Sequence, residues 1–400
     1  MPSVGETKPI YWRRRTAAVV ILVAVVVAVV IAVGGAGGGD PSELTATLDE
    51  LADDEAPEEV PETRLRVSFS GDLLIHSPVY FQAQALGGGE RYAFEPMLRE
   101  LRPYVNRPDL AVCHAETPIS ADAPPSGYPI FNAPPELAEA VAATGWDACD
   151  TASNHTLDLG QEGVEATLRS LDRAGVEHTG SATSRREQRR TLMLDADGVR
   201  VAIVSFTTDT NGIPLPEPYS VNAATQPRPV IDAARRARER GADAVIVTMH
   251  WASQIAPEYS AEPSEDVRRF ARRLARADEI TAIVGHGPHV VQPFRRLAGK
   301  LVLFSAGNLI SNQTAACCAE ASQDGIVALL DLVVDGDGDR VESARYVPVM
   351  VNHPDYTVLP IGDALDDGQG DEASLRASYE RTVSVVGQIR GVAPIPRRLP

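Results

Sequence analysis

Residues 280–289 read "ITAIVGHGPH", an apolar run that ends in two histidines among glycine and proline. The run is short and rich in branched apolar residues, as in a strand buried on both faces, and Gly287 and Pro288 prevent a helix from continuing it. Further runs of the same form are "LRVSFSGD", "DLAVCHAE", "WDACDTASNH", "VRVAIVSF", "ADAVIVTMHW" and "KLVLFSAGN".

The segments between these runs have the apolar periodicity of helices. They include residues 161–173 and 229–240, and Ser264 is a candidate N-cap for a helix that ends near Ala277. Strands that alternate with helices predict an α/β sandwich, with sheet between helical layers. Asp-Gly turn signals within "VVDGDGDRV" predict an antiparallel hairpin at the sheet edge, and a final helix is expected over residues 371–386.

The N-terminal forty residues have the composition of a membrane anchor. Arg13, Arg14 and Arg15 precede an uncharged run over residues 16–39, and about 20 apolar residues are enough to cross a bilayer as a helix. We expect one transmembrane signal anchor, with residues 1–15 in the cytoplasm and the rest of the chain outside. A cleaved signal peptide is the alternative, but the run exceeds the usual apolar region of about 7–15 residues and no A-x-A site follows it.

The next segment, residues 40–63, is expected to be an acidic, disordered tether. Its stretch from Asp40 to Glu62 carries ten acidic residues and no basic one, and it has no aromatic residue with which to build a core. The globular domain should cover residues 64–390 and be followed by a tail, 391–400. The net charge of −18 argues against nucleic acid as a partner, because binding a phosphate backbone requires a basic face.

Polar residues follow the predicted strands at their carboxyl ends, where α/β sheets bind ligands. Six of the eight histidines lie at these positions. Any one of them alone is more often a structural residue, but together with the carboxylates they form a specific set. The set comprises Asp72 and His76, His114 and Glu116, Asn154, His155 and Asp158, His250, and His286 and His289.

Carboxylate oxygens and imidazole nitrogens together suit divalent Mn, Fe, Zn or Co, and a carboxylate can bridge two such ions. Two ions about 3.5–4 Å apart can hold a phosphate and activate water for in-line displacement. The spacing of His155 and Asp158 also fits a histidine that is oriented by a carboxylate. The sequence therefore predicts two divalent metal ions of unknown identity. The alternative is that the histidines only bond neighbouring loops.

Seven stretches of the sequence resemble the CapA family, which is associated with poly-γ-glutamate capsule synthesis. They are "SFSGDLLIH", "AETPI", "NAPPELAEAVAATGWD", "ASNHTLDLGQEGVEATLRSLDRAGVEHTGSA", "VTMHWASQ", "VGHGPHVVQP" and "FSAGNLI". That family is similar to the calcineurin-like metallophosphoesterases. The resemblance implies a four-layered α/β/β/α sandwich with a dinuclear metal centre on the loops at the strand ends.

The resemblance also implies roles for individual residues. Asp72 would be the carboxylate of the first strand, Glu116 the bridging carboxylate and His155 a general acid backed by Asp158. The remaining metal ligands would be Asn154, His250, His286 and His289. The chain departs from the family pattern at Gly287, where the family commonly has a histidine, and at "HAE", where it has Asn-Leu-Glu.

The four cysteines are consistent with an oxidising compartment. Cys113 and Cys149 lie near the ends of two neighbouring predicted strands and could pair. Cys317 and Cys318 are contiguous, which is compatible with a strained vicinal disulfide, a link to another chain or free thiols. The spacing does not match a zinc-binding CxxC motif.

Two functions from different classes fit these features. The first is a membrane-anchored, extracytoplasmic hydrolase or transferase that uses two metal ions on a phosphoester or an anionic envelope polymer. The second is a non-catalytic accessory subunit that binds the polymer or a membrane synthase during synthesis or export. Metal-binding residues favour the first function, whereas the single anchor and the acidic tether favour work beside a membrane partner.

Overall fold

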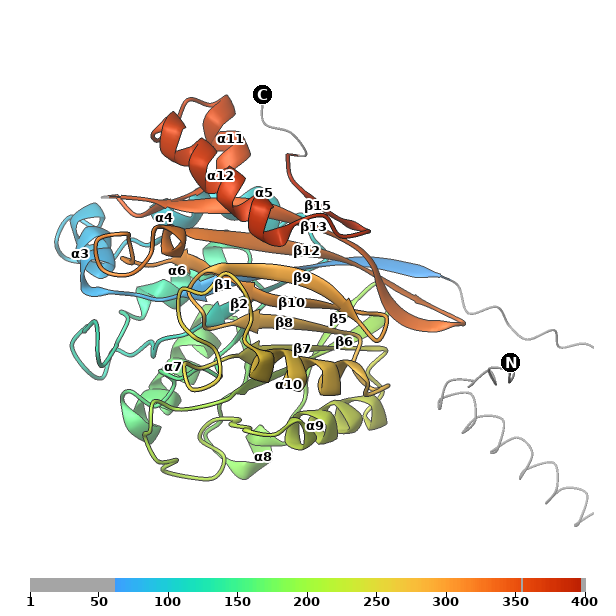
Figure 1. Ribbon diagram of the computed structural model, residues 1–400. Helices are drawn as coiled ribbons and strands as arrows, with labels where there is room; N and C mark the ends of the chain where they lie inside the picture. The colour runs from blue at the N-terminus through green and yellow to red at the C-terminus, as the bar shows by residue number, and fades with distance from the viewer. Residues whose placement is uncertain (1–61, 354, 397–400) are drawn as a thin grey trace, which may run out of the picture. The chain divides into compact units, whose positions relative to one another are not determined.

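The computed structural model describes residues 62–353 and 355–396 (Figure 1). Within this part, Thr63–Val334 and the residues from Asp339 onward belong to one compact unit. The predicted anchor, residues 16–39, lies outside the described residues, as does nearly all of the predicted tether. Among the residues that are described, no helix has both the length and the apolar character needed to span a bilayer.

The larger of two sheets has nine strands, with parallel and antiparallel neighbours. Its order is β14-β13-β12-β1-β2-β3-β4, with β11 beside β1 and β15 beside β13. The strands are β1 (Thr63–Leu73), β2 (Leu110–Ala115), β3 (Ala148–Asp150), β4 (Glu177–Thr179), β11 (Asn308–Ile310), β12 (Asp324–Asp335), β13 (Gly338–Asn352), β14 (Thr357–Pro360) and β15 (Val392–Pro394).

The smaller sheet has six strands in the order β5-β6-β7-β8-β10-β9. Its central strands β6, β7, β8 and β10 are parallel, and β5 and β9 pair antiparallel at the two edges. The bounds are β5 (Leu192–Ala196), β6 (Val199–Thr207), β7 (Ala244–His250), β8 (Ala282–His286), β9 (Val291–Leu297) and β10 (Lys300–Ala306).

Helical segments connect these strands. They are α3 (Ser77–Leu86), α4 (Glu95–Leu98), η1 (Arg99–Leu101), α5 (Arg102–Val105), α6 (Glu136–Thr144), α7 (Gly160–Ala174), α8 (Arg185–Gln188), α9 (Pro227–Glu239), α10 (Glu265–Ala275), η2 (Glu320–Gln323), α11 (Ile361–Asp366) and α12 (Glu372–Val386).

Three apolar clusters show how the layers pack. One lies between the nine-stranded sheet and helices α3 to α7, and it includes Leu73 and Leu137. The second fills the space between the two sheets, with Phe69 of β1 opposite side chains such as Ile246 of β7. The third lies between the six-stranded sheet and helices α9 and α10. The layers therefore follow in the order helices, sheet, sheet, helices.

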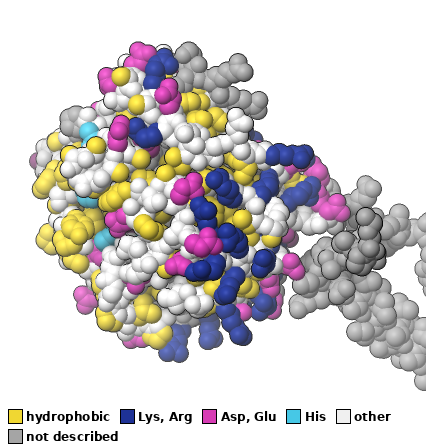
Figure 2. Space-filling model, viewed as in Figure 1, with side chains coloured by type: hydrophobic (Ala, Val, Ile, Leu, Met, Phe, Trp, Pro, Cys, Tyr) yellow, Lys and Arg dark blue, Asp and Glu magenta, His cyan; other side chains and the backbone are white. Residues whose placement is uncertain are grey.

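The outer helices are amphipathic in the way their sequences predict. In α10 the side chains of Val267, Phe270 and Leu274 are buried against the sheet, and the arginines point outward. Figure 2 shows basic side chains gathered over α9 and α10. Ser264 caps α10 by accepting a hydrogen bond from the Val267 backbone N–H, as the sequence predicts.

The C-terminal hairpin is present, but not at the sheet edge. β12 pairs with β1 on one side and neighbours β13 on the other, and β14 then covers β13. The strand-like pattern predicted the hairpin correctly, whereas its placement was wrong because the short strand β14 carries too little sequence to be recognised. The final helix begins after its N-cap Asp371 and ends at Val386, as expected.

Glycines let β11 approach β1 closely at the carboxyl end of the sheet. The backbone N–H of Asp72 donates to the Gly307 carbonyl at 2.9 Å. A Cβ on Gly71 would collide with that carbonyl oxygen, and a Cβ on Gly307 would lie 2.6 Å from the Asp324 carbonyl oxygen. Only glycine therefore fits at either position without a shift of the backbone.

This close approach leads to a stability prediction. Gly71→Ala should lower the free energy of unfolding by about 1–3 kcal/mol, because the added methyl group overpacks two backbones that cannot separate. Urea denaturation of the full chain would measure the change. Gly336→Ala is the matched control, since a Cβ there meets no atom within 4 Å. Equal stability of the two variants would contradict the prediction.

Candidate metal centre

The strand register brings the polar residues of both sheets to one edge. In the nine-stranded sheet, Asp72 pairs with His114, which in turn pairs with Asp150. In the six-stranded sheet, His250 pairs with His286. Paired residues on neighbouring parallel strands point to the same face of the sheet. These side chains therefore face one another across the space between the two sheets.

A bulge places Asp72 on that inner face. Phe69 pairs with Val112, but the next pair is Asp72 with His114, so β1 contains one more residue than β2 over this interval. Without the extra residue, strict alternation after Phe69 would turn Asp72 away from the other sheet. The bulge therefore puts the Asp72 carboxylate on the same face as Phe69.

Three polar contacts described below join the sheets at this edge. Asp72 Oδ1 lies 2.9 Å from His286 Nδ1, and the Gly287 backbone N–H donates to Asp72 Oδ2 at 3.2 Å. His114 Nε2 lies 3.0 Å from His250 Nδ1, and the other ring nitrogen of His114 lies 2.6 Å from Asp150 Oδ1. These five side chains are all buried. A buried charged group needs such partners to offset its lost hydration.

Two overlapping groups of ligand atoms result. Asp72, His114 and His286 form one group, and Asp72, Glu116 and His289 form the other, with the ligand atoms of each within 4.8 Å of one another. Asp72 belongs to both groups, whereas Glu116 belongs to one. Both carboxylate oxygens of Glu116 are buried and have no hydrogen-bond partner among the described residues, and the same holds for His286 Nε2.

Asn154 and His155 lie where the chain leaves β3. Asn154 donates from its Nδ2 atom to Asn211 at 3.2 Å, and its buried Oδ1 atom has no partner in the described part of the chain. His155 Nδ1 lies 2.8 Å from Asp158 Oδ2, which also accepts the Phe131 backbone N–H at 2.8 Å. The His155 ring packs edge-on against the Phe131 ring, with centroids 4.7 Å apart. Asp158 thus holds both the histidine and the adjoining loop.

The pKa values of Asp72 and Glu116 are shifted in opposite directions. Burial opposes ionisation of Asp72, but the hydrogen bond and charge of His286, together with His114 and His250, hold its pKa below the usual range. Burial and the charges of Asp72, Glu258 and Asp158 raise the pKa of Glu116 well above its usual value. Without a cation, Glu116 therefore favours its protonated form.

The histidines also differ in pKa. Burial lowers the pKa of His250 and of His289, so both favour the neutral form that can bind a metal. Burial acts in the same direction on His114, but the nearby Asp150 carboxylate outweighs it and raises the pKa. His76 lies at the edge of the pocket, where burial and the charges of His289 and His155 lower its pKa to about 4.

The predicted site residues are thus brought to one region, with differences in detail. Asp72, Glu116, His286 and His289 share the two groups, while His250 contacts His114 and its Nε2 atom faces Gly287. The sequence suggested no partner for His114 and did not single out Asp150 or Asn308. Asp150 could have been found from the strand register, since it ends a strand beside His114.

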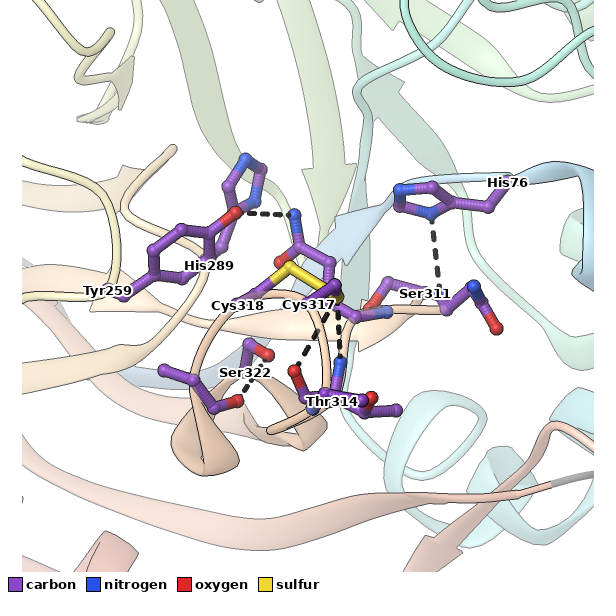
Figure 3. The surroundings of a disulfide bond; sticks show 12 residues. His76, Tyr259, His289, Ser311, Thr314, Cys317, Cys318 and Ser322 are labelled. Carbon is purple, nitrogen blue, oxygen red and sulfur yellow. Dashed lines mark hydrogen bonds between the residues drawn. A yellow bond between two sulfur atoms is a disulfide. The ribbon is translucent and has the colours of Figure 1, made fainter.

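The residues of the candidate site are little exposed, and a loop with a disulfide lies beside them. Asn154, His155 and His289 are each less than one-tenth exposed, and Figure 2 shows only small areas of histidine on the visible face. The bonded pair Cys317–Cys318 lies beside Tyr259 and His289 (Figure 3). The second pair, Cys113–Cys149, joins β2 to β3 with Cα atoms 4.4 Å apart. Each pairing is one that the sequence left open.

Residues 66–313 match the profile of a protein family described as "Bacterial capsule synthesis protein PGA_cap". This match covers more than half of the chain. The chain belongs to the PGA_cap family. All the residues of the two ligand groups lie within the matched region. The family resemblance inferred from the sequence motifs is therefore confirmed.

Two curated relatives of this PGA_cap chain are about one-quarter identical to it over the aligned residues. The capsule biosynthesis protein CapA of Bacillus anthracis is 25% identical over 233 residues, which are 56% of this chain and 55% of that protein. A probable polyglutamine synthesis accessory protein of Mycobacterium tuberculosis is 27% identical over 262 residues, 61% of this chain and 66% of that protein. The chain thus spans between about half and two thirds of the length of these relatives.

Solved structures similar to this chain include phosphatases and phosphoesterases at low identity. A phosphatase from Mycoplasma pneumoniae is 12% identical, covers 81% of this chain and 100% of its own, and has a TM-score of 0.44. The calcineurin-like phosphoesterase YfkN from Bacillus subtilis is also 12% identical. It covers 82% of this chain and 99% of its own, with a TM-score of 0.44.

The donor set fits divalent metal ions on the chemistry of its own atoms. Buried carboxylate oxygens and imidazole nitrogens converge, and Glu116 and His286 direct partnerless polar atoms into the pocket. A bound cation would compensate those atoms, whose burial otherwise costs stability. The residues that would hold cations are Asp72, Glu116, Asn154, His286 and His289, with His250 adjacent to them.

The raised pKa of Glu116 predicts how the metal-free chain responds to pH. Because this pKa is higher in the folded than in the unfolded chain, folding takes up a proton, and wild-type stability falls as the pH rises from the unfolded value toward the folded one. Glu116→Gln cannot ionise. The free energy of unfolding of Glu116→Gln should therefore exceed that of the wild type by an amount that grows with pH. Above neutral pH the difference should reach about 1–3 kcal/mol, the cost of an unsatisfied buried group.

Urea denaturation of the chelator-treated full chain between pH 5 and pH 8 would test this. The range lies above the ordinary glutamate pKa of about 4.3, so Glu116 is ionised in the unfolded chain throughout. The exposed Glu90→Gln provides the matched control. A difference between Glu116→Gln and the wild type that is constant across this pH range would show that Glu116 is not held protonated.

Proposed function

We propose that this PGA_cap chain is a dinuclear-metal hydrolase or transferase of the metallophosphoesterase type. It would act on a phosphoester or an anionic polymer during capsule or poly-γ-glutamate synthesis at the cell envelope. The observation that carries the proposal is the pair of overlapping ligand groups that share Asp72, with both oxygens of Glu116 buried and partnerless among the described residues. The Bacillus relative named for capsule biosynthesis supports the biological context.

The protein's part in such a reaction follows from its own side chains. When bound, two divalent ions supply Lewis acidity and lower the pKa of water. Asp72, Glu116 and His289 would orient them, and the near-complete burial of these side chains excludes bulk water. The low exposure of the pocket favours a substrate group that is small or extended where it enters.

His155 is suited to hold a proton over a leaving oxygen. Its Nδ1 atom is committed to Asp158, because an ionised carboxylate can only accept and the 2.8 Å separation is that of a hydrogen bond. Nε2 is then the nitrogen free to give and take the catalytic proton. Asp158 is itself held by the Phe131 backbone N–H, so the position of the imidazole is tied to the loop beside the pocket.

If His155 is the general acid, replacing it should lower turnover and leave the metal content unchanged. His155→Ala should lose about 10²- to 10⁴-fold in turnover on phosphoester or γ-glutamyl substrates, because acid catalysis is removed. Its metal content, measured by elemental mass spectrometry, should equal that of the wild type, whereas Glu116→Ala should lose metal.

His178→Gln provides a control for replacing a buried histidine, since His178 bonds Asp172 on the protein surface and lies outside the ligand groups. Loss of metal from His155→Ala would reassign this residue as a ligand.

The site is expected to work outside the cytoplasm, on a single-pass anchor at residues 16–39. The support comes from the uncharged run that follows Arg13–Arg15, and from four cysteines that are all paired, as suits an oxidising compartment. The lipid bilayer would then be a partner through residues 16–39, and residues 40–63 would separate the bilayer from the domain.

The orientation can be tested by labelling. A cysteine introduced at Ser42 should react with a membrane-impermeant thiol reagent in intact cells, since residues beyond the anchor are expected outside. A cysteine at Ser3 should react only after lysis. The reverse pattern would overturn the orientation.

An accessory role is the second candidate. It is favoured by the Mycobacterium tuberculosis relative, whose name describes an accessory protein of polyglutamine synthesis, and by Gly287 in place of a family histidine. In that role the domain would bind the anionic polymer or a membrane synthase without turnover. Metal analysis of the full chain, together with assays on phosphoester and γ-glutamyl substrates, separates the two functions. An accessory subunit would turn over neither substrate even when loaded with metal.

A further inference from the structure

Asn308 lies at the centre of a hydrogen-bond network directly behind the proposed metal ligands. It begins β11 and pairs in register with Asp72, so it occupies the position next to the carboxylate shared by both ligand groups. Its side chain is fully buried. The sequence presents it only as the asparagine of "FSAGNLI", with no role assigned.

The orientation of the Asn308 amide is determined by its neighbours. Nδ2 lies 2.9 Å from the backbone carbonyl oxygen of Ser322, which can only accept a hydrogen bond. Nδ2 also donates to Gln313 Oε1 at 3.0 Å. The amide nitrogen must therefore face the loop after β11, and the amide oxygen must face the opposite way, toward His289.

This orientation specifies the tautomer of His289. The Asn308 Oδ1 atom lies 3.1 Å from His289 Nδ1, and an amide oxygen can only accept. His289 Nδ1 must then carry the proton, so the lone pair of the neutral ring is on Nε2. That nitrogen lies 3.9 Å from Glu116 Oε1, the other side chain of its ligand group.

No other described group is placed to specify this tautomer. The nearest alternative acceptor for His289 Nδ1 is Asp72 Oδ2, which lies 3.7 Å away and is too distant for a hydrogen bond. If the proton moved to Nε2, the lone pair would leave the metal-facing side of the ring. Metal binding requires that lone pair, because histidine ligates as the neutral imidazole.

We propose that Asn308 is a positioning residue that holds His289 in the Nδ1–H tautomer and thereby prepares Nε2 to bind a metal ion. The inference rests on the proposed metal centre and extends it to a residue that would not touch the ion. Partners of this kind behind metal ligands typically alter metal affinity about 10- to 100-fold when they are removed.

Asn308 also links His289 to the loop that contains the Cys317–Cys318 disulfide. Its Nδ2 atom donates to Gln313 and to the Ser322 carbonyl in the loop between β11 and β12, and to the His289 carbonyl at 3.4 Å. Gln313 in that loop donates to the Tyr259 hydroxyl at 3.3 Å (Figure 3). A variant of Asn308 will therefore disturb the loop as well as His289. The test must separate loss of the acceptor from loss of the loop.

Two substitutions make that separation. Asn308→Asp retains an oxygen that accepts from His289 Nδ1 but loses the donors to Gln313 and Ser322. Asn308→Leu has a similar size and loses both functions. Gln313→Leu is the matched control, because it weakens the loop and leaves the acceptor in place. All three should lower the melting temperature of the full chain.

Zn²⁺ affinity of the full chain, measured by competition with a chelator, should fall about 10- to 100-fold in Asn308→Leu. Asn308→Asp and Gln313→Leu should remain much closer to the wild type. Equal losses in Asn308→Asp and Asn308→Leu would show that Asn308 acts only by supporting the loop, and would overturn the proposal.

The tautomer can be read without metal or activity. Nitrogen-15 histidine spectra of the metal-free full chain, with the His289 signals assigned from His289→Gln, should show Nδ1–H in the wild type and in Asn308→Asp. Nε2–H in the wild type would overturn the proposal even if Asn308→Leu fails to fold. If the wild-type chain takes up no Zn²⁺, the metal centre fails as a proposal, while these spectra still decide the role of Asn308.

Discussion

The close contact between Asp72 and His286 holds the carboxyl ends of the two sheets together, and the remainder of the pocket depends on it. Asp72 is completely buried at the end of β1, where an isolated carboxylate would be costly. His286 and the Gly287 backbone N–H, both from the opposite sheet, satisfy it. On the other side of β1, Gly71 and Gly307 let β11 lie against the strand without side-chain interference.

Once the sheets meet in this way, the polar residues of neighbouring strands fall into place. His114 reaches His250 from the opposite sheet, and Glu116 and His289 approach the same carboxylate. The arrangement leaves Glu116 without a proton donor among the described residues and raises its pKa. Buried side chains with a purely structural role seldom have two oxygens without hydrogen-bond partners. The Glu116 carboxylate is therefore characteristic of a site that binds a cation.

In the proposed mechanism, metal binding and proton transfer belong to different parts of the pocket. The ligand groups lie deep between the sheets, while His155 is attached to Asp158 and to the loop that contains Phe131. This separation is the one that the proposed hydrolytic mechanism requires. It would also let an accessory member of the family keep its fold if the acid function were lost, because the sheet contacts do not involve His155.

The sequence by itself determined the central strands, the capped helix after Ser264 and the positions of the polar residues, because these depend on local periodicity and on residue type. Short strands such as β14 were not recognised. It also identified the family, since the motifs around Asp72, Asn154 and His286 are contiguous. Only the tertiary structure decided which polar atoms meet. The bulge before Asp72 reverses the face that alternation predicts, and the amide of Asn308 acquires its orientation from the distant Ser322 carbonyl. Such contacts join residues far apart in the chain, so no local pattern could have specified them.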